Sequence, residues 1–196
     1  MGRQGHSIWG KLGSVIATLP AIVTIGNFDG FHRGHQHLIR QVVDRARVLG
    51  LPACAVTFDP HPRAVLRPHE PLHQLTPIRE KVKLLRLAGI QNIWVCEFTP
   101  ELAKLDAPEF LNLVQARWPL AELWVGADFA LGRARSGSQD VLRRLGFEQG
   151  WRLQVVAPLH VAGEPVSSTR IRTLLDKNRH AEATSLLGRA APTIAR

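Results

Sequence analysis

Two histidines separated by two residues are the groups in this chain best placed to do chemistry. His32 and His35 bracket Gly34 in residues 25–38, a run that passes from an apolar strand through a glycine-rich turn into a helix. A helix N-terminus presents unpaired backbone N–H groups and a partial positive charge, which favour phosphate. Glycine permits close approach of the backbone to a ligand, and side chains three residues apart share one helical face. The run therefore predicts a site where both imidazoles donate N–H bonds to one phosphate of a nucleotide.

A second group of candidate residues lies near the C-terminus. Three hydroxyl residues stand where a helix should begin, and such residues cap helices well. Two arginines follow in the first turn, where the helix dipole disfavours positive charge unless an anion is bound there. We expect this conflict to mark a functional site; the alternative is an ordinary helix cap with solvated arginines. The residues are Ser167, Ser168, Thr169, Arg170 and Arg172.

Both motifs belong to a chain in which strands and helices alternate. Apolar runs predict strands over residues 22–26, 53–58, 92–96, 123–126 and 153–157. Helices are predicted over 35–49, from Pro77 with Thr76 as its cap, from the capping box 106–109 to about Trp118, and over 138–149, 168–176 and 181–187. Continuously apolar strands separated by amphipathic helices predict an α/β fold with a Rossmann-like parallel sheet covered by helices on both faces.

Ligands bind at the carboxyl ends of the strands in such sheets. Residues 26–35, 59–62 and 126–137 fall there, so we expect the site to form from these segments. No linker or repeat divides the chain, which predicts one domain over residues 1–189 and a tail over 190–196.

Composition narrows the class of protein further. The net charge of +9 invites a nucleic-acid partner, but the basic residues are scattered, so the alternative of weak attraction for small anions is preferred. Cys54 and Cys96 lie in apolar runs and are expected to be buried thiols in a reducing compartment, and no Cys/His spacing suggests a metal site. Residues 1–7 lead into no signal-peptide core, and no apolar stretch is long enough to span a membrane, which predicts a cytoplasmic protein.

Taken together, the two motifs resemble the FMN adenylyltransferase (FAD synthetase) domain of the bacterial bifunctional riboflavin kinase/FMN adenylyltransferase family, which belongs to the HxGH nucleotidyltransferase superfamily. The resemblance covers about residues 20–189 in the order of the family. It is carried by residues 24–35, 57–62, 75–81, 125–129, 136–137 and 166–172.

The resemblance implies an enzyme that converts FMN and ATP, with Mg²⁺, into FAD and pyrophosphate. The FMN phosphate would attack the α-phosphorus of ATP in line, so catalysis would consist of positioning and charge stabilisation. His32 and His35 would bind the phosphates and the charge of the transition state. Ser168 and Thr169, with Ser167, would hold the β- and γ-phosphates, and Arg172 would neutralise the pyrophosphate. The other residues that the resemblance assigns to substrate binding are Gly26, Asn27, Phe28, Asp29, Gly34, His61, Pro62, Asp128 and Phe129. Arg170 lies at a position that the family leaves variable and is a candidate of lower rank. The resemblance identifies no metal ligands.

The sequence departs from the family where the acceptor would bind. Ala130 and Leu131 replace an arginine and an aromatic residue, and Leu66 replaces another aromatic residue. These changes would weaken flavin binding or fit the site to another acceptor, although Phe110 and Phe129 could supply an aromatic wall. The chain also stops where the kinase domain of the family would begin, so a stand-alone adenylyltransferase or a specialised paralogue is expected.

Two alternatives to an FMN adenylyltransferase remain open from the sequence. One is a nucleotidyltransferase that acts on a different phosphate-bearing acceptor. The other is a non-catalytic flavin or nucleotide sensor, which intact phosphate-binding motifs disfavour. In each case the expected partners are small molecules, neither a membrane nor nucleic acid is expected, and the oligomeric state is left open.

Overall fold

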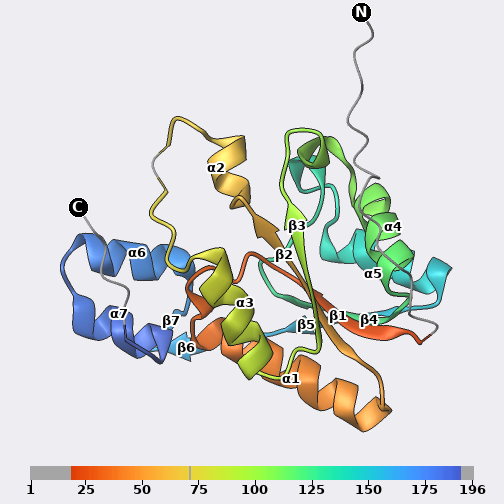
Figure 1. Cartoon of the computed structure of the whole chain (residues 1–196), viewed down its shortest axis with the longest axis horizontal. Coiled ribbons are helices and arrows are strands. Elements are labelled where there is room, and N and C mark those ends of the chain that lie inside the picture. Colours follow the sequence, from red (N-terminus) through yellow and green to blue (C-terminus); the bar gives the residue numbers. More distant parts are fainter. Residues whose placement is uncertain (1–18, 71, 191–196) are drawn as a thin grey trace, which may run out of the picture.

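A computed structural model of the chain describes residues 19–70 and 72–190, and the statements below refer to these residues. The expectation for residues 1–7 lies outside this range, as does that for the tail beyond Ala190. Five parallel strands form the central sheet in the order β3-β2-β1-β4-β5 (Figure 1). They are β1 (Ala21–Ile25), β2 (Ala53–Asp59), β3 (Asn92–Glu97), β4 (Leu120–Gly126) and β5 (Arg152–Val156). The predicted parallel α/β sheet is therefore confirmed.

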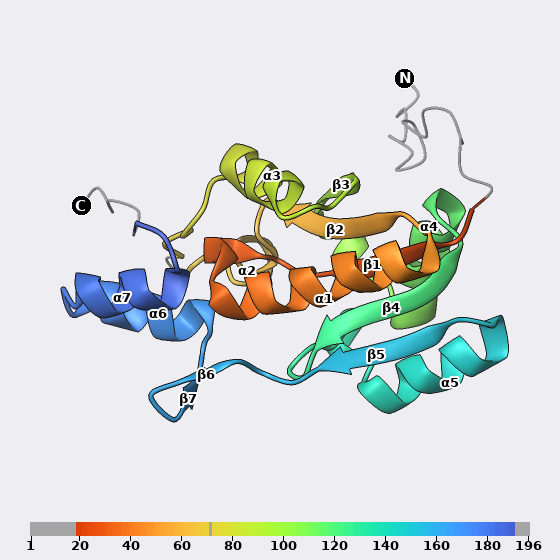
Figure 2. The same cartoon turned by 90° about the horizontal axis from the view of Figure 1, so that it is seen from below.

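Helices cover both faces of this sheet (Figures 1 and 2). On one face, α1 (Arg33–Leu49) and α3 (Ile78–Leu87) share a hydrophobic cluster with β1 and β2. On the other face, α4 (Ala107–Arg117) and α5 (Gln139–Gln149) share a larger cluster that reaches β4. The strands β1 and β2 are buried along almost their whole length, which explains why their sequences are nearly continuously apolar, whereas the edge strands β3 and β5 include exposed residues.

A third cluster lies beside the N-terminal end of α1, where α6 (Ser168–Asp176) and α7 (His180–Leu187) pack on each other and on Leu75. This packing brings the C-terminal part of the chain next to the turn that follows β1. The histidine motif and the hydroxyl motif, which lie far apart in the sequence, are therefore close together in space, at the carboxyl end of β1.

Several local predictions need correction. Helix α1 begins at Arg33 rather than residue 35, because the His32 side chain caps it. Thr76 is not the cap of α3: Pro77 holds that position, and the Thr76 hydroxyl accepts a hydrogen bond from Arg189 (2.8 Å). By contrast, the predicted capping box of α4 is present.

Several short elements were not predicted. They are helix α2 (Pro62–Leu66), the hairpin of β6 (His160–Val161) and β7 (Glu164–Pro165), and 3-10 turns at Asp29–Phe31, Leu102–Lys104 and Arg133–Arg135. Both cysteines are buried in strands, as expected. Within the described ranges, no helix has the length and apolar character needed to cross a membrane.

Candidate active site

The two sequence motifs line one cavity of about 450 Å³ at the carboxyl end of β1. His32, Gly34 and His35 contribute one side of it, from the start of α1. Residues 167–169 and Arg172 contribute another side, from the start of α6. The Ser168 hydroxyl donates to the Asp29 carbonyl (2.8 Å) and joins the two segments. The structure thus brings together the histidine pair and the hydroxyl motif, as the resemblance implies.

The histidine rings are stacked on each other rather than spread apart. Their centroids lie 3.6 Å apart with the planes inclined by 16°. The His32 Nδ1 accepts the backbone N–H of His35 (3.2 Å), which leaves the Nε2 of His32 to carry the proton of the neutral ring. A Cβ on Gly34 would lie 3.2 Å from the Val166 carbonyl oxygen, so glycine allows α1 to approach the segment that leads into α6.

Both imidazoles are neutral near pH 7. Burial, together with the charge of Arg172, lowers the pKa of His32 to about 4. Burial also lowers the pKa of His35 well below its usual value, with smaller contributions from His32 and Lys81. The His35 Nδ1 is buried and has no hydrogen-bond partner among the described residues. Each ring therefore has one N–H group that can donate a hydrogen bond, and neither ring carries a positive charge.

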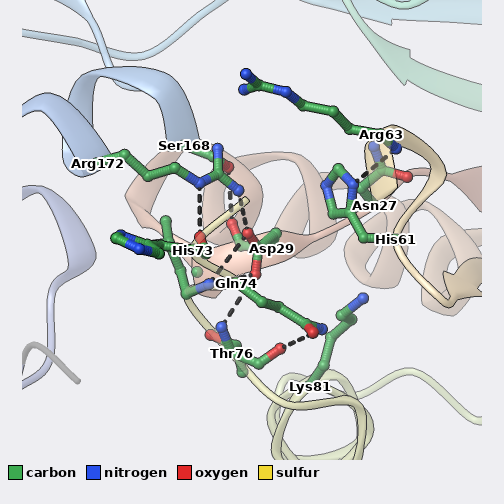
Figure 3. Close-up of polar contacts among 12 residues, drawn as sticks. Asn27, Asp29, His61, Arg63, His73, Gln74, Thr76, Lys81, Ser168 and Arg172 are labelled. Carbon is green, nitrogen blue, oxygen red and sulfur yellow. Dashed lines mark hydrogen bonds and ion pairs between the residues drawn. The ribbon is translucent and has the colours of Figure 1, made fainter. Parts of the chain in front are cut away.

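Arg172 is held in place by a buried carboxylate (Figure 3). Asp29 is 1% exposed and forms an ion pair with the Arg172 guanidinium. Its carboxylate also accepts the backbone N–H groups of Leu75 and Thr76, each at 3.0 Å. Asp29 does not line the cavity; its side chain positions Arg172, which does. A direct contact between Asp29 and a substrate remains a prediction.

Arg170 also has an internal partner. Its Nε lies 3.1 Å from the Glu164 carboxylate, and its Nη1 donates to the carbonyl oxygens of Val161 and Glu164 at 3.0 Å each. The sequence left open whether a bound anion or solvent would offset the two arginines at the start of α6. In the structure both arginines pair with carboxylates of the protein, Arg172 with Asp29 and Arg170 with Glu164.

A second, mostly apolar cavity of about 530 Å³ adjoins the first. Phe110 and Phe129 both line it, and Phe110 lies parallel to Trp94 with centroids 6.2 Å apart. The two cavities have four lining residues in common, which are Gly26, Asn27, Asp128 and Phe129. Leu66, Ala130 and Leu131, the positions that depart from the family pattern, line the second cavity as well.

The two substrate-binding residues predicted after β2 lie on different cavities. His61 lines the first and Pro62 the second. Burial lowers the pKa of His61 to about 4, so this ring is neutral near pH 7 as well. Among the remaining predicted residues, Phe28 lines the first cavity and packs edge-on against His35, with centroids 5.4 Å apart.

Sequence reasoning missed two basic residues near the site. Lys81 is fully buried, and its Nζ lies 3.4 Å from both the Thr57 hydroxyl and the Phe58 carbonyl oxygen. Burial lowers the pKa of this ammonium group, while Asp29 and Asp59 act in the opposite direction. Its position four residues before Leu85, on the buried side of α3, was the available signal.

Arg63 is the other residue that sequence reasoning missed. It lines the first cavity from α2, an element that sequence patterning did not predict. Within residues 19–70 and 72–190, the structure contains no group of three or more His, Cys, Asp or Glu side chains that could hold a metal ion.

The class that the fold defines is a Rossmann-like α/β domain, with helices on both faces of a parallel sheet and a histidine pair at the carboxyl end of its first strand. The family model described as FAD synthetase matches residues 16–170, so the chain belongs to the FAD synthetase family.

Curated relatives support this assignment. A protein of Geobacillus thermodenitrificans named "Putative bifunctional riboflavin kinase/FMN adenylyltransferase" is 36% identical over 87% of this chain and 92% of its own length. Bifunctional riboflavin kinase/FMN adenylyltransferases of Pseudomonas fluorescens and Escherichia coli K12 are 34% and 33% identical, respectively. The chain spans 54% of the length of each of these two proteins.

Solved structures agree on the fold. A crystal structure from Streptococcus pneumoniae, described as a macrolide-efflux protein, has a TM-score of 0.76 at 28% identity, over 88% of this chain and 58% of that one. A pantoate-beta-alanine ligase from Francisella tularensis has a TM-score of 0.50 at 13% identity, over 87% of this chain and 80% of that one, a likeness that concerns the fold alone.

Proposed function

We propose that this chain is an FMN adenylyltransferase, which transfers AMP from ATP to the phosphate of FMN and releases pyrophosphate. Its membership of the FAD synthetase family and the names of its relatives support this activity. The observation that carries the proposal is the pair of adjoining cavities. One is lined by the histidine and hydroxyl motifs and suits a triphosphate, whereas the other is mostly apolar and suits a planar ring system.

The proposed reaction needs no protein nucleophile. An oxygen of the FMN phosphate attacks the α-phosphorus of ATP near the wall that the two cavities share, and the bond to the β-phosphate oxygen breaks as pyrophosphate leaves. His32 and His35 donate N–H bonds to oxygens that gain charge during this step. Ser167, Ser168 and Thr169 hold the β- and γ-phosphates. Arg172, fixed by Asp29, donates hydrogen bonds to the leaving pyrophosphate.

Mg²⁺ enters the proposal as part of the substrate, the complex of Mg²⁺ with ATP. The phosphate oxygens bind the ion, and it lowers the negative charge that the protein must balance. The proposal also keeps the cytoplasmic location expected from the sequence.

Incubation of the full chain with FMN, ATP and Mg²⁺, followed by measurement of FAD and pyrophosphate, tests the activity. Equimolar appearance of both products is expected, and folded protein that forms no FAD at saturating FMN would exclude it. His37→Ala is a matched control for His35→Ala, because His37 is exposed on the same helix and lines neither cavity.

A panel of other phosphate-bearing acceptors belongs in the same assay. Leu66, at the rim of the apolar cavity, and Leu131 replace residues that are aromatic in the family. Faster release of pyrophosphate with a non-flavin acceptor than with FMN would show that FMN is not the preferred acceptor. The proposed transfer of AMP from ATP would still hold.

A further inference from the structure

Helix α2 contributes residues to both cavities. Arg63 lines the cavity that holds the histidine pair, while Pro62 and Leu66 line the apolar one. We propose that Arg63 is a further substrate-binding residue, which leaves its ion pair with Glu70 and binds a phosphate group in the histidine cavity. The inference rests on the proposed function and adds to it a residue that neither the sequence motifs nor the resemblance indicates.

The present partners of Arg63 leave it available for a ligand. Its Nη2 donates to Glu70 at 3.0 Å, but its Nε is buried and has no hydrogen-bond partner among the described residues. Both ends of the ion pair are solvent-accessible, with the Arg63 side chain 41% exposed. Exposed ion pairs contribute little to stability, so breaking this one requires little free energy.

Glu70 would keep a cationic partner if Arg63 moved. The Arg67 Nη1 donates to both oxygens of the same carboxylate, each at 3.3 Å. Two arginines therefore share a single carboxylate, and one positive charge of this group is unbalanced. Transfer of Arg63 to a phosphate would leave the Glu70–Arg67 pair intact and would balance that charge.

The other basic residues that line the histidine cavity supply little free positive charge. His32, His35 and His61 are neutral near pH 7, for the reasons given above. Arg172 is balanced by the buried Asp29 carboxylate. Among the described residues that line this cavity, Arg63 is thus the cation whose charge no buried carboxylate balances.

A guanidinium group suits this role better than an ammonium group. Its planar set of donors can bind two oxygens of one phosphate at once. The unsatisfied Nε and an Nη group of Arg63 form such a pair of donors. The phosphate could belong to the nucleotide or to the acceptor, because the two cavities adjoin at Asn27 and Asp128.

Isothermal titration calorimetry on the full chain shows whether the phosphate that Arg63 binds belongs to the nucleotide or to the acceptor. The ligands are Mg²⁺ with α,β-methylene-ATP, which cannot transfer AMP, and FMN. Arg63→Met should weaken binding of one ligand about ten- to a hundredfold, the range expected for a lost hydrogen bond to a charged group. Arg63→Lys should recover part of the loss. A loss confined to the ATP analogue assigns Arg63 to the nucleotide, and a loss confined to FMN assigns it to the acceptor.

Arg67→Met is the matched control, because Arg67 binds the same carboxylate but lines neither cavity. It should change both affinities by less than about twofold, and Glu70→Gln should leave them equal or stronger. Unchanged binding of both ligands by Arg63→Met, or an equal loss in Arg67→Met, would overturn the inference. If the wild-type protein binds neither ligand, the proposed function itself is contradicted. Circular dichroism confirms that each variant is folded.

Discussion

Replacement of Asp29 by asparagine is the sharpest test of how the two motifs are held together. In the folded chain, this carboxylate accepts two backbone N–H groups and pairs with Arg172, although 143 residues separate the two side chains in sequence. Asparagine has nearly the same shape and keeps one acceptor oxygen. The variant therefore removes the negative charge and one acceptor with little change in volume.

The expected loss of stability follows from the burial of both partners. Asp29 is 1% exposed and the Arg172 side chain is 14% exposed, so the variant leaves a largely buried guanidinium without its carboxylate partner. Removal of one member of a buried ion pair costs about 3–5 kcal/mol. For a chain of this size each kcal/mol corresponds to about 2–4 °C, which gives a fall in the melting temperature of roughly 6–20 °C.

Thermal unfolding followed by circular dichroism measures this change. Asp44→Asn is the control, because Asp44 forms an exposed pair with Arg47 at 3.1 Å and should contribute about 0–1 kcal/mol. The double variant Asp29→Asn with Arg172→Met should lose less stability than the sum of the single variants, since it leaves no unpaired charge. A single Asp29→Asn variant as stable as Asp44→Asn would refute the role assigned to this carboxylate.

Three further predictions address the histidines and the apolar cavity. His35→Ala should lower turnover about a hundredfold, the usual effect of losing one donor to the transition state; near wild-type turnover in the FAD assay would contradict it. The wild-type melting temperature should fall as the pH drops from 6.5 towards 4, because folding lowers the pKa of His32 and of His61 to about 4 and that of His35 well below its usual value, so in that window these groups take up protons mainly in the unfolded chain. His32→Asn keeps a capping acceptor and should flatten this fall, so an equally steep fall would argue against burial of a neutral His32. Leu66→Phe should strengthen FMN binding about two- to tenfold, from an added aromatic contact in the apolar cavity, and titration calorimetry that finds unchanged or weaker binding would exclude this contact.

The sequence predicted the sheet well because its central strands, such as β1 and β2, are buried on both faces. An apolar run such as that of β1 (Ala21–Ile25) is visible without knowledge of its neighbours, and its bounds shifted by a single residue. The start of α1 was predicted too late because the side chain that caps it belongs to His32, a residue type outside the usual capping set. Helix α2, with five residues, is too short to show a helical period.

The sequence predicted the parts of the site whose residues are neighbours in sequence. It did not predict the contacts between residues that lie far apart in sequence. The histidine and hydroxyl motifs are local patterns, and the structure places them on one cavity. That Asp29 supports Arg172 from outside the cavity depends on the packing of α6 beside the β1 turn, which no local pattern encodes. The buried Lys81 likewise acquires its surroundings from β2, more than twenty residues earlier.

The two arginines of the histidine cavity differ in how they would act. Arg172 is fixed by a buried carboxylate and needs no rearrangement when charge develops on a leaving group. Arg63 must first leave an exposed pair, at a cost of about 0–1 kcal/mol, and would gain about 1.5–3 kcal/mol from a charged hydrogen bond to phosphate. The difference favours movement of Arg63 only when a phosphate is present.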